Sequence, residues 1–201
     1  MTSVTISAKD VSELRARTGA GMMDCKRALE EAGGDMDKAG EILRKKGIAK
    51  AEKRAGRTAS QGVVVSYIHH NQQVGVLVEL NSETDFVARN EAFQQLARDI
   101  ALHIASADPI GVSPEDVPAD LVERERRIAE EQVAAEGKPE AVRAKIVDGK
   151  VKKFIAERTL LEQPYVRDDK KTVGELVKEV SGKLGEVVTV KRFARFQVGA
   201  A

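Results

Sequence analysis

Cysteine is nearly absent from this chain of 201 residues, since Cys25 is the only one. A single cysteine excludes an intramolecular disulfide and a zinc site built on several cysteines. We interpret Cys25 as a small buried apolar residue. Long apolar runs are lacking too: none approaches the roughly 18 residues of a membrane span. The N-terminal MTSVTISAKD has no basic stretch followed by an apolar run, as a signal peptide would. These absences predict a cytoplasmic protein with no membrane partner.

An excess of charge of either sign is also missing. The chain has 33 Lys and Arg against 32 Asp and Glu, which leaves a formal net charge of +1. The overall balance therefore gives no reason to expect direct nucleic-acid or membrane binding. Hydrophobic residues make up 42% of the chain, enough for one compact core or for a small domain attached to a larger one.

Motifs that bind nucleotides are not found. The stretch GAGMMD (19–24) has Asp24 where a dinucleotide-binding loop needs its third glycine, and it follows a helical pattern rather than a strand. The phosphate-binding pattern G-x-x-x-x-G-K-[ST] does not occur anywhere in the chain. We therefore do not expect the chain to bind GTP through such a loop.

The three histidines do not indicate catalysis or metal binding. His69 and His70 are adjacent at a predicted strand end, where an extended backbone would point them to opposite faces, so they are not expected to share a metal. His103 lies on or beside the apolar face of a predicted helix, which favours a hydrogen-bonded histidine at the edge of the core. We predict a protein that is not an enzyme, with no catalytic residue, metal or cofactor.

Three short amphipathic helices are predicted at the N-terminus, over residues 8–17, 22–32 and 36–46. Asp35 is suited to cap the third of them and Gly47 to end it. Met22 and Met23 follow the apolar spacing of the second helix, yet two adjacent residues cannot both face inward fully. The pattern predicts a small three-helix domain over residues 1–47, too small to bury much surface alone.

A basic stretch follows, RKKGIAKAEKRAGR (44–57), with seven Lys or Arg and one Glu. It could be a solvated linker, which we place at residues 48–57, or it could contact RNA. No aromatic residue is interleaved for base stacking, so we favour the linker.

The period then changes to that of strands. The β-branched runs GVVVSYI (62–68) and VGVLVEL (74–80) predict a β-hairpin. A long amphipathic helix is predicted to open at TDFVARN (84–90) and to end at Asp108-Pro109. The remaining predicted elements are charged helices over 114–137 and 140–162, a helix over 172–184 and a strand over 186–198. Together they predict an α+β core at residues 58–201, in which helices pack on a small antiparallel sheet and residues 119–162 form a helical hairpin.

The segment TDFVARN has two interpretations that its local pattern does not separate. In the first, Thr84 or Asp85 caps the helix and Phe86 is a core residue of its first turn. In the second, a large apolar side chain beside an acid forms an exposed wedge between the hairpin and the helix.

Three longer stretches resemble elongation factor Ts, in the order of that family. They are LRARTGAGMMDCKRALEEAGGDMDKAGEILRKKG (14–47), ELNSETDFVARNEAF (79–93) and LLEQPYVRDDKKTVGELVKEV (160–180), followed by RFARFQVG (192–199). The first two are specific individually, and the set spans nearly the whole chain.

The resemblance implies a guanine-nucleotide exchange factor for the GTPase elongation factor Tu, bound when that GTPase holds GDP or no nucleotide. It implies a three-helix domain like ubiquitin-associated domains that docks on the GTPase, with Arg15, Met22 and Met23 at family contact positions. It also implies that Thr84, Asp85, Phe86 and Val87 reach the magnesium site of the GTPase. Of the two methionines, we expect one to be exposed for docking.

Only one hairpin-and-helix unit is evident, which resembles the short form of this family and implies a homodimer. A disulfide between the copies is not expected, because Cys25 lies in the small domain. Two alternatives remain: an RNA- or ribosome-binding adaptor that uses residues 44–57, and a generic helix- or peptide-docking module formed by the N-terminal helices.

Overall fold

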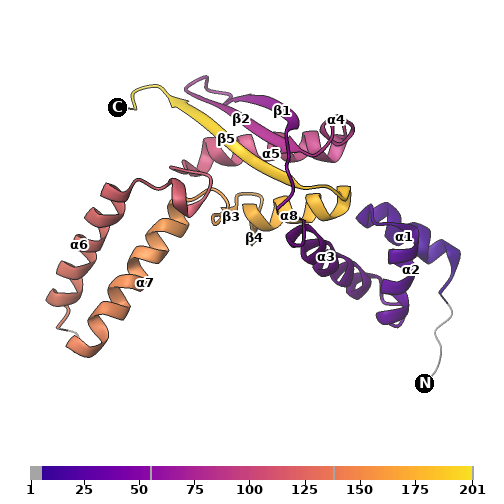
Figure 1. The fold of residues 1–201 in the computed structure, drawn as a ribbon, viewed down its shortest axis with the longest axis horizontal. Coiled ribbons are helices and arrows are strands. Elements are labelled where there is room, and N and C mark those ends of the chain that lie inside the picture. Colours follow the sequence, from indigo (N-terminus) through magenta and orange to yellow (C-terminus); the bar gives the residue numbers. More distant parts are fainter. Residues whose placement is uncertain (1–5, 55, 138, 201) are drawn as a thin grey trace. The chain divides into compact units, whose positions relative to one another are not determined.

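The computed structural model describes residues 6–54, 56–137 and 139–200, which form helices and two small sheets (Figure 1). The helices are α1 (Ala8–Thr18), α2 (Met22–Glu31), α3 (Met36–Glu52), α4 (Asp85–Ala88), α5 (Glu91–Ala107), α6 (Ala119–Ala135), α7 (Glu140–Arg158) and α8 (Val173–Leu184). The strands are β1 (Gln61–Ile68), β2 (Val74–Ser82), β3 (Pro164–Tyr165), β4 (Asp168–Thr172) and β5 (Val188–Gln197). The predicted α+β class is confirmed.

The described residues divide into two compact units, and each is built from several segments. The first unit holds residues 6–62, Asn81–Phe93 and Val177–Thr189; the second holds Val63–Leu80, Gln94–Leu176 and residues 190–200. The predicted domain limits at 47 and 57 and the helical hairpin 119–162 stay predictions. Where these ranges include residues 1–5, 55, 138 or 201, they lie outside the described residues.

Helices α1, α2 and α3 pack around one apolar cluster, as their 3.6-residue periodicity predicts. Its buried members are Val11, Leu14, Cys25, Ala28, Leu29 and Ala39. Ser7 begins α1 by accepting a hydrogen bond from the Asp10 backbone N–H, and the Asp10 carboxylate accepts one from Ser7 in return. Asp35 caps α3 as predicted, since Oδ1 accepts from the N–H groups of Asp37 and Lys38 at 3.0 Å.

The predicted end of the third helix at Gly47 is wrong, because α3 continues to Glu52. Gly47 instead lies at a close contact between α3 and α8. A Cβ added to Gly182 of α8 would lie 2.5 Å from the carbonyl oxygen of Gly47, so the two backbones meet where neither residue has a side chain. Ion pairs Lys178–Glu52 and Arg44–Glu179 span the same two helices. The first five residues of the predicted linker are therefore helical and packed.

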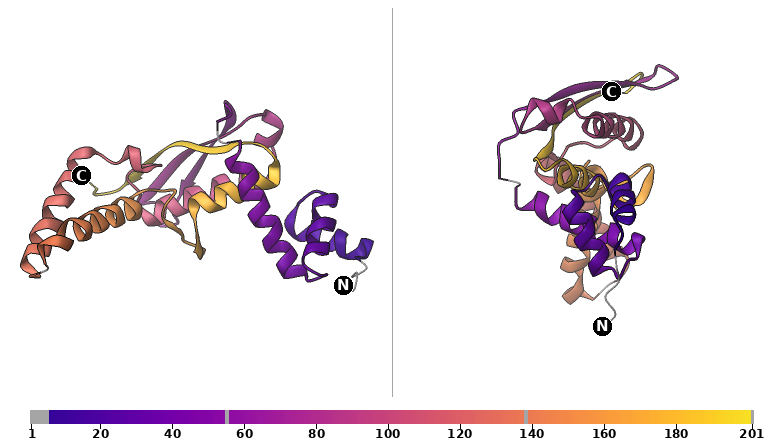
Figure 2. Two further views of the ribbon diagram at one scale, coloured as in Figure 1. Left: turned by 60° about the horizontal axis from the view of Figure 1, so that its bottom comes forward. Right: turned by 90° about the vertical axis from the view of Figure 1, so that its right-hand side faces the viewer.

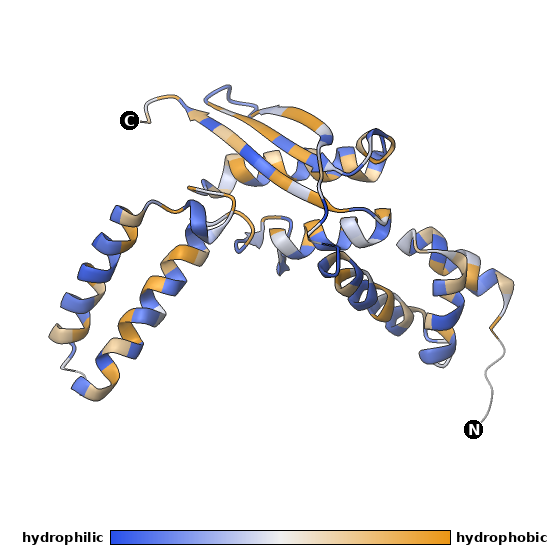
Figure 3. Cartoon of the chain, viewed as in Figure 1, coloured by the Kyte–Doolittle hydropathy of each residue, from blue (hydrophilic) through white to orange (hydrophobic). Residues whose placement is uncertain are grey.

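The larger sheet has the strand order β1-β2-β5 and presents one buried and one exposed face. On the central strand, Val76, Val78 and Leu80 are buried while Leu77 is 47% exposed. This alternation follows from the two-residue period of a strand. Figure 3 shows apolar residues on all three strands, with β5 alternating between polar and apolar positions.

Helices α6 and α7 run side by side as a separate antiparallel pair (Figures 1 and 2). Their seam consists of small and β-branched residues, Ala129, Val133, Val147 and Val151. The predicted helix over 114–137 is shorter than expected, because Pro118 precedes α6 and a separate 3-10 turn occupies Pro114–Asp116. After α7, β3 pairs antiparallel with β4. Among the described residues, no helix is long and apolar enough to cross a bilayer.

His103 on α5 is fully buried and hydrogen-bonded, as predicted. Its Nδ1 accepts from the backbone N–H of Val166 at 3.3 Å, so Nε2 carries the proton and donates to Gln163 Oε1 at 2.9 Å. The Gln163 amide donates in turn to the Glu157 carbonyl oxygen at 2.8 Å. Burial lowers the pKa of His103, and both ring nitrogens are satisfied only in the neutral form.

We predict that the free energy of unfolding falls as the pH drops below about 6.5, where an unfolded histidine takes up a proton. The folded state binds this proton only at lower pH, so stability from neutral His103 is complete above that value and declines below it. Urea unfolding between pH 7.5 and 5 measures the slope. His103→Gln should flatten it, while the exposed-site control His70→Gln should not. An unchanged slope in His103→Gln would contradict the assignment.

Candidate partner-binding site

The turn Thr84–Val87 joins the end of β2 to α4. Thr84 is extended, with φ −125° and ψ 157°, and its Oγ1 accepts from the Val87 backbone N–H at 3.4 Å. It therefore caps α4, as the first interpretation predicted. The predicted single long helix is wrong, however: α4 ends at Ala88, and α5 begins at Glu91 after Asn90, whose side chain accepts from the Ala92 N–H.

A carboxylate more than one hundred positions away anchors this turn. Glu186, between α8 and β5, accepts from the Thr84 backbone N–H at 3.0 Å through Oε2 and from Thr84 Oγ1 at 2.6 Å through Oε1. In the opposite direction, Glu83 Oε1 accepts from the Val187 backbone N–H at 2.8 Å. These reciprocal hydrogen bonds to charged groups hold the segment that follows β2 against the segment that precedes β5.

Further hydrogen bonds hold the two sides of this anchor. Ser82 is fully buried, and its hydroxyl donates to the Thr84 carbonyl oxygen at 2.9 Å. The Ser181 hydroxyl donates to the carbonyl oxygen of Glu186 at 2.5 Å. Arg57 lies 3.4 Å from Glu83 and adds a cation beside that carboxylate. The backbone of the turn is thus restrained from both ends.

Phe86 projects from this restrained turn and is 80% exposed. The interpretation of Phe86 as a core residue is therefore wrong. Exposing a phenylalanine forgoes roughly 2 kcal/mol of burial free energy, and a single exposed apolar residue is common on protein surfaces. What distinguishes Phe86 is the rigidity of its support, since aromatic side chains held in place bind partners at low entropic cost.

Asp85 and Val87 flank the exposed ring. Asp85 pairs with Arg89 one helical turn on, at 2.8 Å, and both side chains are substantially exposed. Such a surface pair contributes little to stability, so Asp85 can exchange this partner at small cost. Val87 is half-buried and its N–H is satisfied by Thr84. The turn therefore presents one apolar ring and one carboxylate.

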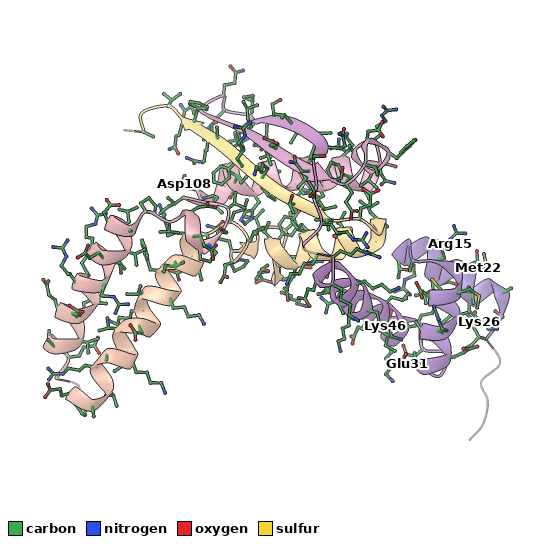
Figure 4. The ribbon with its side chains drawn as sticks, in the orientation of Figure 1. Arg15, Met22, Lys26, Glu31, Lys46 and Asp108 are labelled. Atoms are coloured by element: carbon green, nitrogen blue, oxygen red, sulfur yellow. The ribbon has the colours of Figure 1, made fainter. Side chains whose placement is uncertain are left out.

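The three residues expected to dock the N-terminal helices are all exposed. Arg15 is exposed on α1, and Met22 and Met23 at the start of α2 are 57% and 64% exposed. Figure 4 labels Arg15 and Met22. At least one of the two methionines was expected to be exposed, and in the structure both are. Within α2 the first buried member of the packed cluster is Cys25, so Met22 and Met23 precede the buried part of this helix.

These two sets of residues belong to the same unit but make no hydrogen bond or ion pair with each other among the described residues. The anchoring pair Glu83 and Glu186 was not predicted. An isolated acid after a helix carries no local signal, because its role depends on a partner 102 residues away.

The histidine pair also differs from its prediction. Strand β1 ends at Ile68, so His69 and His70 lie in the turn and their ring centroids are 4.2 Å apart, rather than on opposite faces of a strand. Within the described ranges, no cluster of His, Cys, Asp or Glu side chains is arranged to hold a metal ion.

Comparison with known proteins covers almost the whole chain. The family model for elongation factor Ts matches residues 4–200. The chain is 54% identical over 195 residues to elongation factor Ts of Desulfosudis oleivorans, covering 97% of this chain and 98% of that protein. It is 56% identical to the protein of the same description from Desulforamulus reducens (96% and 89% covered) and 54% identical to that from Thermosipho melanesiensis (96% and 99%).

We predict that Glu186→Ala loosens the turn without unfolding the chain. Removal of the carboxylate leaves the Thr84 N–H and hydroxyl without their acceptor, which should lower the free energy of unfolding by about 1–3 kcal/mol. Hydrogen exchange at the Thr84 amide should accelerate as well. Glu162→Ala, at an exposed position, is the control. Unaltered exchange at Thr84 in a folded Glu186→Ala variant would contradict the anchoring role.

Proposed function

Because the chain belongs to the elongation factor Ts family, we propose that it promotes the release of GDP from elongation factor Tu during translation elongation. The observation that carries this function beyond the family is Phe86, an exposed aromatic ring on a turn anchored by Glu186. Proteins of this kind bind a partner and change its affinity for a ligand, so we propose that the chain catalyses no covalent step and needs no cofactor of its own.

The proposed mechanism acts on the magnesium site of the GTPase. Magnesium requires near-ideal octahedral geometry and bridges the nucleotide phosphates to such a protein. Insertion of Phe86 into an apolar crevice beside that site, with Asp85 disturbing the neighbouring polar contacts, would displace the ion or its ligands. The anchoring of the turn favours this role, because a backbone that Glu186 already restrains at Thr84 loses little entropy when the turn inserts.

The coupling is reciprocal. If the bound factor weakens nucleotide binding, the nucleotide must weaken binding of the factor by the same ratio. Exchange can therefore proceed in either direction and follows the relative concentrations of GTP and GDP. The expected complexes are with the GDP-bound and nucleotide-free GTPase, and Arg15, Met22 and Met23 are the proposed docking residues of the N-terminal helices.

The wedge predicts a specific loss of function. Asp85→Ala with Phe86→Ala should lower the stimulated rate of labelled GDP release from elongation factor Tu by about tenfold or more, the effect typical of losing a central aromatic contact. Thermal unfolding should be nearly unchanged, since both side chains are exposed.

The matched control is Val166→Ala with Asp169→Ala, which also removes one exposed apolar side chain and one carboxylate, in the second unit. Full exchange activity in the folded Asp85→Ala/Phe86→Ala variant would eliminate the wedge mechanism while leaving the family assignment intact.

We also propose that two copies associate through the exposed face of the larger sheet. Exposed apolar side chains lie on each of its strands: Val64 and Ile68 on β1, Leu77 on β2 and Phe196 on β5. Several exposed apolar side chains on one sheet favour a surface that a protein partner covers. A second copy of the same face is self-complementary, as a two-fold dimer requires.

Sedimentation tests this dimer. The chain should sediment as a dimer, and Ile68→Glu with Leu77→Glu should convert it to a monomer, because two carboxylates would be buried without partners. Val142→Glu, at an exposed apolar position of α7, should leave the dimer intact. A wild-type chain that sediments as a monomer at micromolar concentration would remove this proposal.

A further inference from the structure

A cavity of about 620 Å³ in the first unit is lined by α2, α3 and the C-terminal end of α8. This volume lies within the usual range for sites that bind small molecules. Its lining is strongly cationic, and the cations come from three separate segments of the chain. They are Arg27 of α2, Lys46 and Lys50 of α3, Lys53 and Arg54 just beyond α3, and Lys183 of α8.

The acidic groups near the cavity neutralise only part of this charge. Asp24, the one acidic residue among the described residues of the lining, is shared between Arg27 at 2.6 Å and Lys50 at 3.1 Å. These two hydrogen bonds lower the pKa of Asp24 and keep it ionised. Lys46 pairs with Glu31 at 2.5 Å, and both side chains are exposed; both are labelled in Figure 4. Lys53 and Lys183 form no ion pair with a described residue.

Arg54 provides the most specific observation. Its Nη1 is buried and has no hydrogen-bond acceptor among the described residues. A buried guanidinium nitrogen without an acceptor costs free energy, and native structures rarely leave one unsatisfied. Arg54 is also one of the residues that line the cavity, and the five N–H donors of a planar guanidinium fork suit phosphate oxygens.

The start of α2 contributes to the same cavity. Gly21, its N-cap, lines the cavity and has no side chain to accept from the first free N–H groups of this ten-residue helix. The positive end of the helix dipole therefore adds to the field of the lysines and arginines. The Lys183 side chain lies against the backbone at Gly19, since a Cβ added to Gly19 would lie 2.1 Å from Lys183 Cε.

We propose that this cavity is a binding site for a small polyphosphate anion. Several closely spaced negative charges match cations that converge from three segments, better than a single carboxylate or sulfate would. No aromatic side chain lines the cavity among the described residues, so bases have no stacking surface, and a concave site of this size does not follow a nucleic-acid backbone. The site is independent of the exchange turn.

Calorimetric titration of the full chain with inorganic triphosphate tests the site. Binding should be saturable at one site per chain and should weaken as salt increases, and bound triphosphate should raise the melting temperature. Lys53→Gln with Lys183→Gln should weaken binding by about tenfold or more, because each loses a charge-assisted contact. These two side chains support no ion pair, so the variant should stay folded.

Lys9→Gln with Lys170→Gln removes the same net charge at exposed positions and should change the affinity less than about twofold. Absence of binding at millimolar triphosphate, or an equal loss in this control, would overturn the site. So would tight binding of an RNA oligonucleotide that depends on Lys53 and Lys183 but is not competed by triphosphate. Because GDP release is measured separately, failure here leaves the exchange function untouched.

Discussion

Glu186 accepts two hydrogen bonds from Thr84, and this carboxylate fixes the conformation on which the exposed turn depends. The restraint acts on backbone and side chain together, because one oxygen takes the N–H and the other takes the hydroxyl. Glu83 returns the same type of contact to Val187, so the end of β2 and the approach to β5 restrain each other. An aromatic ring at the tip of a mobile loop loses backbone entropy each time it binds, whereas the backbone beside Phe86 is already restrained through Thr84.

The N-terminal helices combine a packed interior with an outer surface kept free. Cys25 and Leu29 face the cluster, whereas Met22 and Met23 at the start of the same helix face solvent. Flexible, polarisable methionine side chains adapt to a partner surface at little cost. The contact of Gly47 with Gly182 gives α3 a fixed neighbour beyond the three-helix cluster. The residues just after this cluster therefore continue α3 as a packed helix, whereas a solvated linker would only connect two domains.

The packing of α3 also decides where the basic residues near its end are placed. In the sequence they form a run without a pattern, but the helix turns several of them toward one cavity, to which α2 and α8 bring further cations. Charge that is balanced over the whole chain is thus locally unbalanced. This difference between global and local charge is what makes a specific anion site compatible with a net charge of +1.

Local pattern in the sequence determined the periodicity of the helices, the hairpin, the cap at Asp35 and the buried Cys25. Each of these is encoded within a few residues of the position concerned, whereas the resemblance that identifies the family is carried by stretches that span nearly the whole chain. Only the tertiary structure decided that Phe86 is exposed, that Gly47 continues a helix, and that Glu186 anchors the turn. The physical reason is that these features depend on partners far away in the chain: Glu186 meets Thr84 across 102 positions, and Gly47 meets Gly182 across an even longer interval. Contacts of that kind leave no periodic or neighbouring signal, so no reading of adjacent residues could separate an exposed wedge from a core phenylalanine.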